Sequence, residues 1–143
     1  MKICFCGSNE EIAGARLLAE DLGIEIVSEG CDICVSTSCT DGGYLSVKLD
    51  GREAKITYGG GRARLYRGLA ILASWLREGK ECGEIIERPV FSLDGAMVDM
   101  SRNAVTNVKT VKLMLRKMAL MGMNAFMLYT EDTYEIENRP YFG

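Results

Sequence analysis

The chain has 143 residues, of which 48% are hydrophobic and 26% are charged, a balance typical of a globular protein with a packed core. Its formal net charge of −3, without any basic run, argues against nucleic acid or an anionic membrane as a partner. No apolar run reaches the length of a membrane-spanning helix and no signal peptide is visible, so a cytoplasmic location is expected. The sequence contains no histidine, which excludes histidine-based acid–base catalysis from this segment.

The first half of the chain alternates between strand-like and helix-like segments. Five short segments predict strands: residues 2–6, 24–28, 32–37, 44–49 and 53–58. Between the first two, Ser8 and Glu11 have the spacing of a capping box, which predicts a helix that ends at Gly23. Between the last two, Asp50-Gly51 is the strongest short-range signal for a hairpin.

A second helix and a polar link complete this half. Leucine and alanine recur on one face between Arg62 and Arg77, which predicts a helix there. Residues 80–89 are interpreted as a polar link that ends at Arg88-Pro89, because proline disfavours helix in the residue before it. We therefore expect residues 1–88 to form one small α/β domain with a sheet and two helices.

The second half, residues 89–143, has the pattern of a strand–helix–strand unit. Ala96–Val98 form the apolar body of a first, buried strand, and Ala125–Tyr129 form a second strand. The helix between them is expected from Val105 to Met123, because an apolar stripe runs along it. The stripe comprises Val108, Val111, Met114, Leu115, Met118 and Met121. Such a unit pairs its strands in parallel, and both strands here end in polar residues.

Three segments of this unit carry a resemblance to a known family. Asp99-Met-Ser-Arg102-Asn103 ends the first strand, Met118-Ala-Leu-Met-Gly-Met-Asn124 ends the helix, and Tyr129-Thr-Glu-Asp132-Thr-Tyr134 ends the second strand. They resemble the start of the catalytic barrel of glycoside hydrolase family 20, the β-N-acetylhexosaminidases. The resemblance implies an α/β fold class in which residues 1–88 are a zincin-like α+β domain without a metal. Residues 89–143 would then begin a (β/α)8 TIM barrel, whose core the clustered methionines are expected to fill. Because such a barrel needs about 250 residues, the chain is expected to be an N-terminal fragment.

The resemblance also implies roles for three residues. Arg102 would bind the 3- and 4-hydroxyls of a terminal N-acetylhexosamine, which suits its planar fork of donors. Asp99 would support it, and Asp132 would help to set the environment of the catalytic acid. The residues alone leave open another interpretation, in which Arg102 only forms a structural ion pair with Asp99. Glu131 and Glu135 are interpreted as parts of a solvated acidic loop.

The family's retaining hydrolysis uses the substrate acetamido group, an Asp that orients it and an adjacent Glu as the acid. No Asp-Glu dipeptide occurs in this sequence, so the fragment is expected to be inactive alone. We also expect it to self-associate through exposed barrel edges. The alternative is a self-contained, non-catalytic α/β module for interaction or carbohydrate contact.

The cysteines raise a third hypothesis, a cysteine-bound metal. Six cysteines are present, including Cys31-x2-Cys34-x4-Cys39 and Cys4-x-Cys6. This spacing matches neither the paired motif of zinc ribbons nor the ferredoxin pattern. Buried thiols that act as small hydrophobes are the preferred interpretation, so no metal site and no cofactor are assigned.

Overall fold

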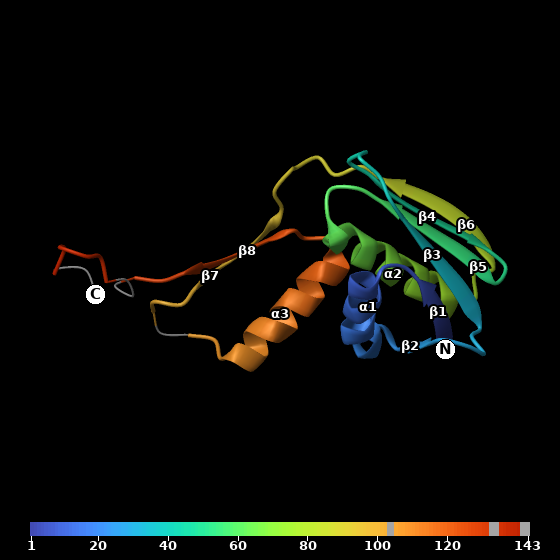
Figure 1. Ribbon diagram of the computed structural model, residues 1–143, viewed down its shortest axis with the longest axis horizontal. Helices are drawn as coiled ribbons and strands as arrows, with labels where there is room; N and C mark the ends of the chain where they lie inside the picture. Colours follow the sequence, from blue (N-terminus) through green and yellow to red (C-terminus); the bar gives the residue numbers. More distant parts are fainter. Residues whose placement is uncertain (103–104, 132–134, 141–143) are drawn as a thin grey trace.

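The structure is a computed structural model that describes residues 1–102, 105–131 and 135–140. Six strands form a mixed sheet with strand order β2-β1-β3-β5-β4-β6 (Figure 1). Its strands are β1 Lys2–Cys6, β2 Glu25–Val27, β3 Ile33–Cys39, β4 Leu45–Asp50, β5 Glu53–Tyr58 and β6 Cys82–Glu87. Strands β2, β1, β3 and β5 are parallel to one another, whereas β4 is antiparallel to both β5 and β6.

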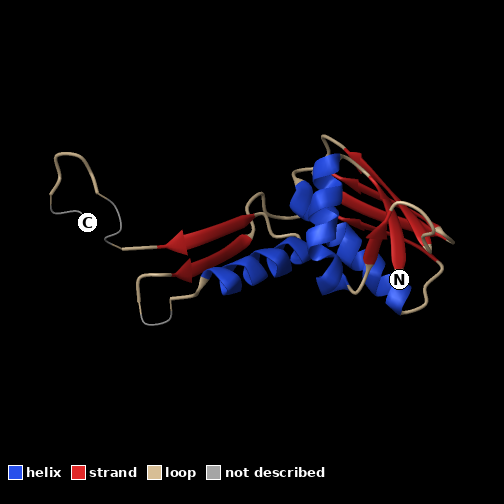
Figure 2. Ribbon diagram, turned by 60° about the horizontal axis from the view of Figure 1, so that its bottom comes forward, coloured by secondary structure: helices blue, strands red, loops and turns tan. Residues whose placement is uncertain are grey.

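Two helices, α1 (Asn9–Leu22) and α2 (Arg62–Arg77), lie on one face of this sheet (Figure 2). Alternate side chains of the strands point toward them, as the period of a strand requires. The largest fully buried side chains are Ile3, Val35, Leu45, Val47, Leu49, Ile56, Leu65, Leu69 and Leu72. The opposite face of the sheet carries polar residues and cysteines that are exposed or half-buried. The core therefore lies between one face of the sheet and the helices.

Local signals predicted the boundaries of the first two helices well. The Ser8 hydroxyl accepts a hydrogen bond from the Glu11 N–H at 3.3 Å, and the Glu11 carboxylate accepts one from the Ser8 N–H at 2.5 Å. This confirms the capping box. Helix α1 ends at Gly23, whose φ of 65° is the left-handed conformation that glycine adopts readily. Helix α2 has the predicted ends.

The hairpin between β4 and β5 is confirmed, but the segment after α2 corrects a prediction. Residues 80–89 were expected to be a polar link, whereas Cys82–Glu87 form strand β6 at the edge of the sheet. Ile85 packs against the core and Ile86 is exposed, so this strand has only a weak alternating pattern. Its backbone pairing with β4 comes from a distant segment, which the local sequence does not encode.

The strand–helix–strand unit is confirmed. Strands β7 (Gly95–Asp99) and β8 (Ala125–Tyr129) pair in parallel and flank helix α3 (Val108–Met121). The helix is shorter than predicted, because Asn107 caps it by accepting a hydrogen bond from the Thr110 N–H at 2.9 Å. The prediction of a buried first strand is wrong for this chain, since Met97 is 66% exposed. The two strands form a separate sheet that extends away from the large one (Figure 1).

Helix α3 attaches this unit to the rest of the described chain by packing against α2 and, less extensively, α1. Met118 is its one buried residue. Asp21 on α1 forms ion pairs of 2.8 Å with both Lys117 and Arg116, which hold the pKa of that carboxyl below its usual range. The expected apolar stripe is mostly uncovered, and Met121 at its end is 59% exposed. Within the described residues, no helix combines the length and apolarity needed to cross a bilayer.

Candidate functional site at the ends of the parallel strands

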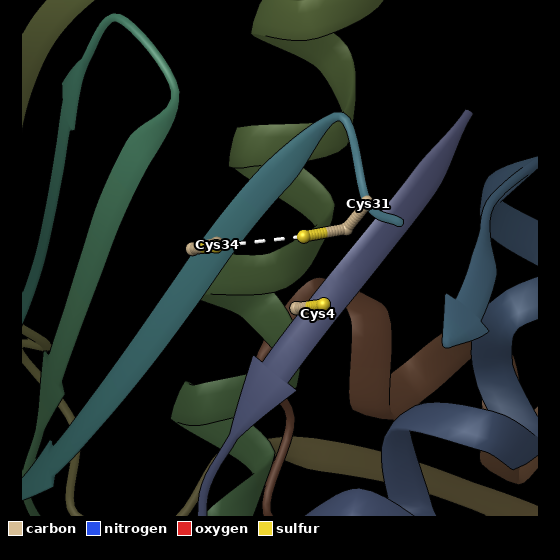
Figure 3. A group of neighbouring side chains, drawn as sticks. All are labelled: Cys4, Cys31 and Cys34. Carbon is tan, nitrogen blue, oxygen red and sulfur yellow. Dashed lines mark hydrogen bonds between the residues drawn. The ribbon is translucent and has the colours of Figure 1, made fainter. Parts of the chain in front are cut away.

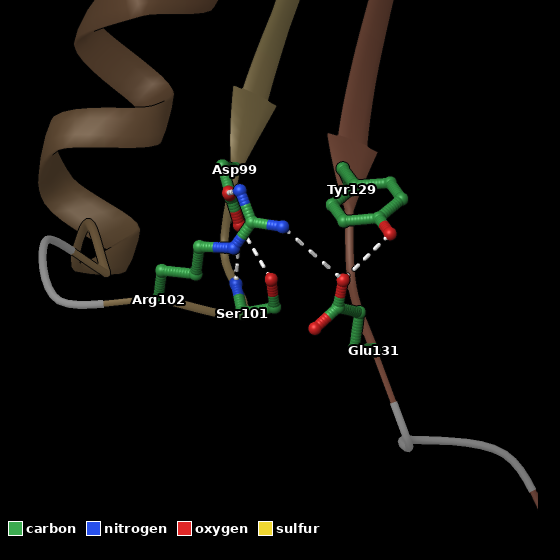
Figure 4. Close-up of polar contacts among 5 residues, drawn as sticks. All are labelled: Asp99, Ser101, Arg102, Tyr129 and Glu131. Carbon is green, nitrogen blue, oxygen red and sulfur yellow. Dashed lines mark hydrogen bonds and ion pairs between the residues drawn. The ribbon is translucent and has the colours of Figure 1, made fainter.

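The carboxyl ends of β7 and β8 bring together polar residues from two segments of the chain (Figure 4). The strand register pairs Asp99 with Tyr129, and the Met100 N–H donates to the Tyr129 carbonyl at 2.7 Å. Residues that follow either strand therefore meet at one edge of the small sheet. Arg102 and Glu131 are the charged residues that the structure places there beside Asp99.

The Asp99 carboxylate is held in a defined orientation. One of its oxygens accepts hydrogen bonds from the Ser101 hydroxyl at 2.6 Å and the Ser101 N–H at 2.9 Å. These bonds, with the nearby charge of Arg102, lower the pKa of Asp99, so the carboxylate stays ionised at neutral pH. Its second oxygen lies 3.4 Å from the Arg102 guanidinium. Asp99 and Arg102 therefore form an ion pair at the end of β7.

Arg102 lies between two carboxylates but is only loosely held. Its guanidinium is 3.4 Å from Asp99 and 3.6 Å from Glu131, and its side chain is 72% exposed. A guanidinium has five N–H donors, and among the described residues two of its nitrogens contact Asp99 and Glu131. The ion pair with Asp99 that the alternative interpretation required is present, and it is compatible with either role.

Glu131 belongs to this cluster, although sequence reasoning assigned it to a solvated loop. Besides its contact with Arg102, its carboxylate accepts a hydrogen bond from the Tyr129 hydroxyl at 2.7 Å. The expected parallel pairing of the two strands could have indicated this contact, because it places the residues after β8 beside those after β7. Glu135 is exposed, as predicted. Asp132, the third residue that the resemblance singled out, lies outside the described residues.

A second polar cluster lies at the carboxyl ends of β3 and β5, beside the start of α1. Glu11 is only 7% exposed, and it accepts hydrogen bonds from the Tyr58 hydroxyl at 2.5 Å and the Thr37 hydroxyl at 3.3 Å. Burial alone would raise the pKa of Glu11, but the bonds from Tyr58, Ser8 and Thr37 outweigh it and lower this pKa. Burial and the bond to Glu11 raise the pKa of Tyr58. Both groups are used in holding α1 on the sheet.

The cysteines correct another prediction, because none of the six thiols is buried. Cys4, Cys31 and Cys34 gather on the open face of the large sheet, where the Cys31 and Cys34 sulfurs are 3.4 Å apart. Shared hydrogen bonds lower the pKa of Cys31 and raise that of Cys34. The hydrogen bond to Cys31 and partial desolvation raise the pKa of Cys4 to about 11. Cys6, Cys39 and Cys82 do not belong to this group of three.

This chain is similar to known proteins in its three-dimensional structure. No family model matches the sequence, and no curated protein matches it. The exo-β-N-acetylglucosaminidase of Vibrio harveyi, a family 20 enzyme solved with N-acetylglucosamine, superimposes on 99% of this chain and 24% of its own, with a TM-score of 0.62 and 20% identity. The β-N-acetylhexosaminidase of Bacteroides fragilis covers 99% of this chain and 31% of its own, with a TM-score of 0.66 and 16% identity.

The same arrangement is also similar to part of a glycosidase from another family. A glycoside hydrolase family 138 enzyme targeting pectin rhamnogalacturonan II covers 98% of this chain and 26% of its own, with a TM-score of 0.56 and 12% identity. The fold shown by these matches is the α/β fold of the N-terminal region of family 20 structures, as the sequence resemblance implied. The chain spans about a quarter to a third of the length of the enzymes it matches.

Proposed function

We propose that this chain is the N-terminal portion of a β-N-acetylhexosaminidase-like glycoside hydrolase. The complete enzyme would remove a terminal N-acetylhexosamine by retaining hydrolysis assisted by the substrate acetamido group. The observation that carries the proposal is the position of Arg102 at the carboxyl ends of two parallel strands, beside Asp99 and Glu131. The fold agrees with it, since 99% of the chain superimposes on two family 20 enzymes.

The chemistry of Arg102 suits the recognition of a sugar. Its rigid, planar guanidinium can donate to two neighbouring hydroxyl oxygens at once, which a lysine ammonium cannot do with the same geometry. Asp99, ionised and fixed by Ser101, would orient one side of the guanidinium. Glu131 would orient the other side. Arg102 would therefore be a substrate-binding residue, with Asp99 and Glu131 as positioning residues.

The bond-breaking groups are proposed to lie in another part of the enzyme. Residues 89–143 would supply the first two strands and the first helix of a barrel, whose active site is formed at the carboxyl ends of its strands. The Asp that orients the acetamido group and the Glu that protonates the leaving oxygen would come from a later strand. The apolar surfaces of β7, β8 and α3 that are uncovered in this chain would pack against the remainder of that barrel.

The test is Arg102→Lys in the complete enzyme, assayed with an aryl β-N-acetylglucosaminide. Loss of charge-assisted hydrogen bonds to two hydroxyls should cost about 2–4 kcal/mol in transition-state binding, or roughly thirtyfold to a thousandfold in kcat/KM. The melting temperature should stay nearly unchanged, because Arg102 is exposed and its ion pairs are long.

Arg62→Lys is the matched control. Arg62 is also an exposed arginine in an ion pair, with Glu10 at 2.6 Å, but it lies at the start of α2. Its substitution should leave kcat/KM unchanged. If Arg102→Lys retains normal kcat/KM, or loses activity only by unfolding, Arg102 has a structural role and the proposed site is wrong.

A further inference from the structure

Three cysteine sulfurs from two neighbouring strands and a connecting loop gather at one place on the open face of the large sheet (Figure 3). Cys4 lies in β1, Cys34 lies in β3, and Cys31 lies in the loop that leads into β3. The three sulfurs are all within 4.8 Å of one another. This cluster is remote from Arg102 and has no part in the function proposed above.

The backbone around the cluster is held by bonds that do not involve the thiols. The parallel register of β1 and β3 sets Cys4 directly opposite Cys34. The loop is tied to β1 at Asp32, whose N–H donates to the Lys2 carbonyl and whose carboxylate accepts from the Lys2 N–H, both at 2.8 Å. The three sulfurs are therefore brought together by the fold of the sheet, before any ligand is present.

Arg52, in the turn between β4 and β5, binds the same loop. Its guanidinium donates to the Cys31 carbonyl at 2.5 Å and to the Asp32 carbonyl at 3.0 Å. This arrangement fixes the position of Cys31 and also brings a permanent positive charge close to the sulfurs. A nearby positive charge reduces the cost of gathering thiolates, which otherwise repel one another.

The spacing of the sulfurs suits a metal ion. With Zn–S bonds of about 2.3 Å and tetrahedral angles, neighbouring sulfurs should lie about 3.8 Å apart. The Cys31–Cys34 separation is 3.4 Å and all separations are below 4.8 Å, so small side-chain rotations suffice. Thiolates are soft ligands that select zinc and similar ions over magnesium or calcium.

We propose that Cys4, Cys31 and Cys34 form a three-thiolate binding site for a zinc ion. Each thiol would release its proton to solvent as it binds, and solvent could complete the coordination where Cys34 is exposed. The ion would join β1, β3 and their loop into one unit. Its function would be structural, because the three ligands come from two strands and a loop that it would hold together.

The experiment uses the whole chain, reduced and freed of metal under nitrogen, and titrated with cobalt(II) as a visible substitute for zinc. The principal variant combines Cys6→Ser, Cys39→Ser and Cys82→Ser, which leaves only the cluster thiols. We expect it to bind one cobalt ion per chain, with a thiolate charge-transfer band and the visible bands of a tetrahedral ion. One equivalent of zinc should remove these bands and raise the melting temperature.

Adding Cys34→Ser to this variant is the matched comparison, with circular dichroism as the check on folding. It should weaken cobalt binding roughly a hundredfold or more and abolish the zinc-dependent rise in melting temperature. The proposal is overturned if the variant that retains the cluster binds no cobalt, or if adding Cys34→Ser leaves binding unchanged. It is also overturned if thiol counting shows that Cys31 and Cys34 remain joined in a disulfide in the presence of reductant.

Discussion

Tyr58→Phe tests the buried polar cluster that holds α1 to the sheet. The Tyr58 hydroxyl donates to one oxygen of Glu11 at 2.5 Å, whereas Ser8 and Thr37 donate to the other oxygen. Phenylalanine keeps the ring and its packing, so no cavity results. The substitution therefore removes one hydrogen bond to an ionised, nearly buried carboxylate and changes little else.

The expected cost follows from the charge on Glu11. A hydrogen bond to a charged group contributes about 1.5–3 kcal/mol, so the free energy of unfolding should fall by about 2 kcal/mol at pH 7. For a chain of this size, that corresponds to a decrease in melting temperature of roughly 5–10 °C. Glu11→Gln should also destabilise the protein, because it removes the charge while keeping the length of the side chain.

The stabilisation by the Tyr58–Glu11 hydrogen bond should depend on pH. Since the folded-state pKa of Glu11 is lowered, its contribution to stability is present above the unfolded pKa of about 4.3 and is lost as the pH falls through the folded pKa. The difference between wild type and Tyr58→Phe should therefore be largest near neutral pH. It should shrink as the pH falls below the unfolded pKa and through the lower folded pKa, because Glu11 is then protonated in both states.

Urea unfolding followed by circular dichroism, from pH 7 down to pH 3, measures this difference. Tyr66→Phe is the control, because Tyr66 is half-buried on α2 and its hydroxyl makes no hydrogen bond to any described residue. It should change stability by less than about 0.5 kcal/mol. An equally small change for Tyr58→Phe at pH 7, or a change that does not depend on pH, would show that the Tyr58–Glu11 hydrogen bond does not stabilise the fold.

Three further predictions concern the second half of the chain. The 143-residue chain alone should not hydrolyse an aryl β-N-acetylglucosaminide, and turnover that survives repurification would contradict this. The chain should self-associate through the exposed sheet of β7 and β8, as measured by sedimentation velocity. The double variant Met97→Lys, Met127→Lys should shift the chain toward monomer, and an unchanged distribution of sedimentation coefficients would exclude this surface. Met118→Ala should destabilise the docking of α3 by about 2–4 kcal/mol, as measured by hydrogen exchange, because Met118 is buried. Met121 is exposed, so Met121→Ala should change little, and equal effects of the two substitutions would contradict this prediction.

Elements with local signals could be predicted from the amino-acid sequence. Ser8 and Glu11 are three residues apart, so the capping box that begins α1 needs no other part of the chain. Asp50-Gly51 specifies its hairpin in the same way, because Gly51 adopts the positive φ of 56° that the turn requires. The motif around Arg102 likewise predicted the fold that the family 20 structures share with this chain.

Features that depend on partners distant in sequence became visible in the three-dimensional fold. Strand β6 exists because β4 offers it a backbone edge, and Glu131 reaches Arg102 because β7 and β8 are in parallel register. The thiols of Cys4 and Cys34 are neighbours because β1 pairs with β3, and they are accessible because the helices cover the other face. Burial and contact between distant residues are set by pairing and layering of whole elements, which the local sequence pattern does not contain.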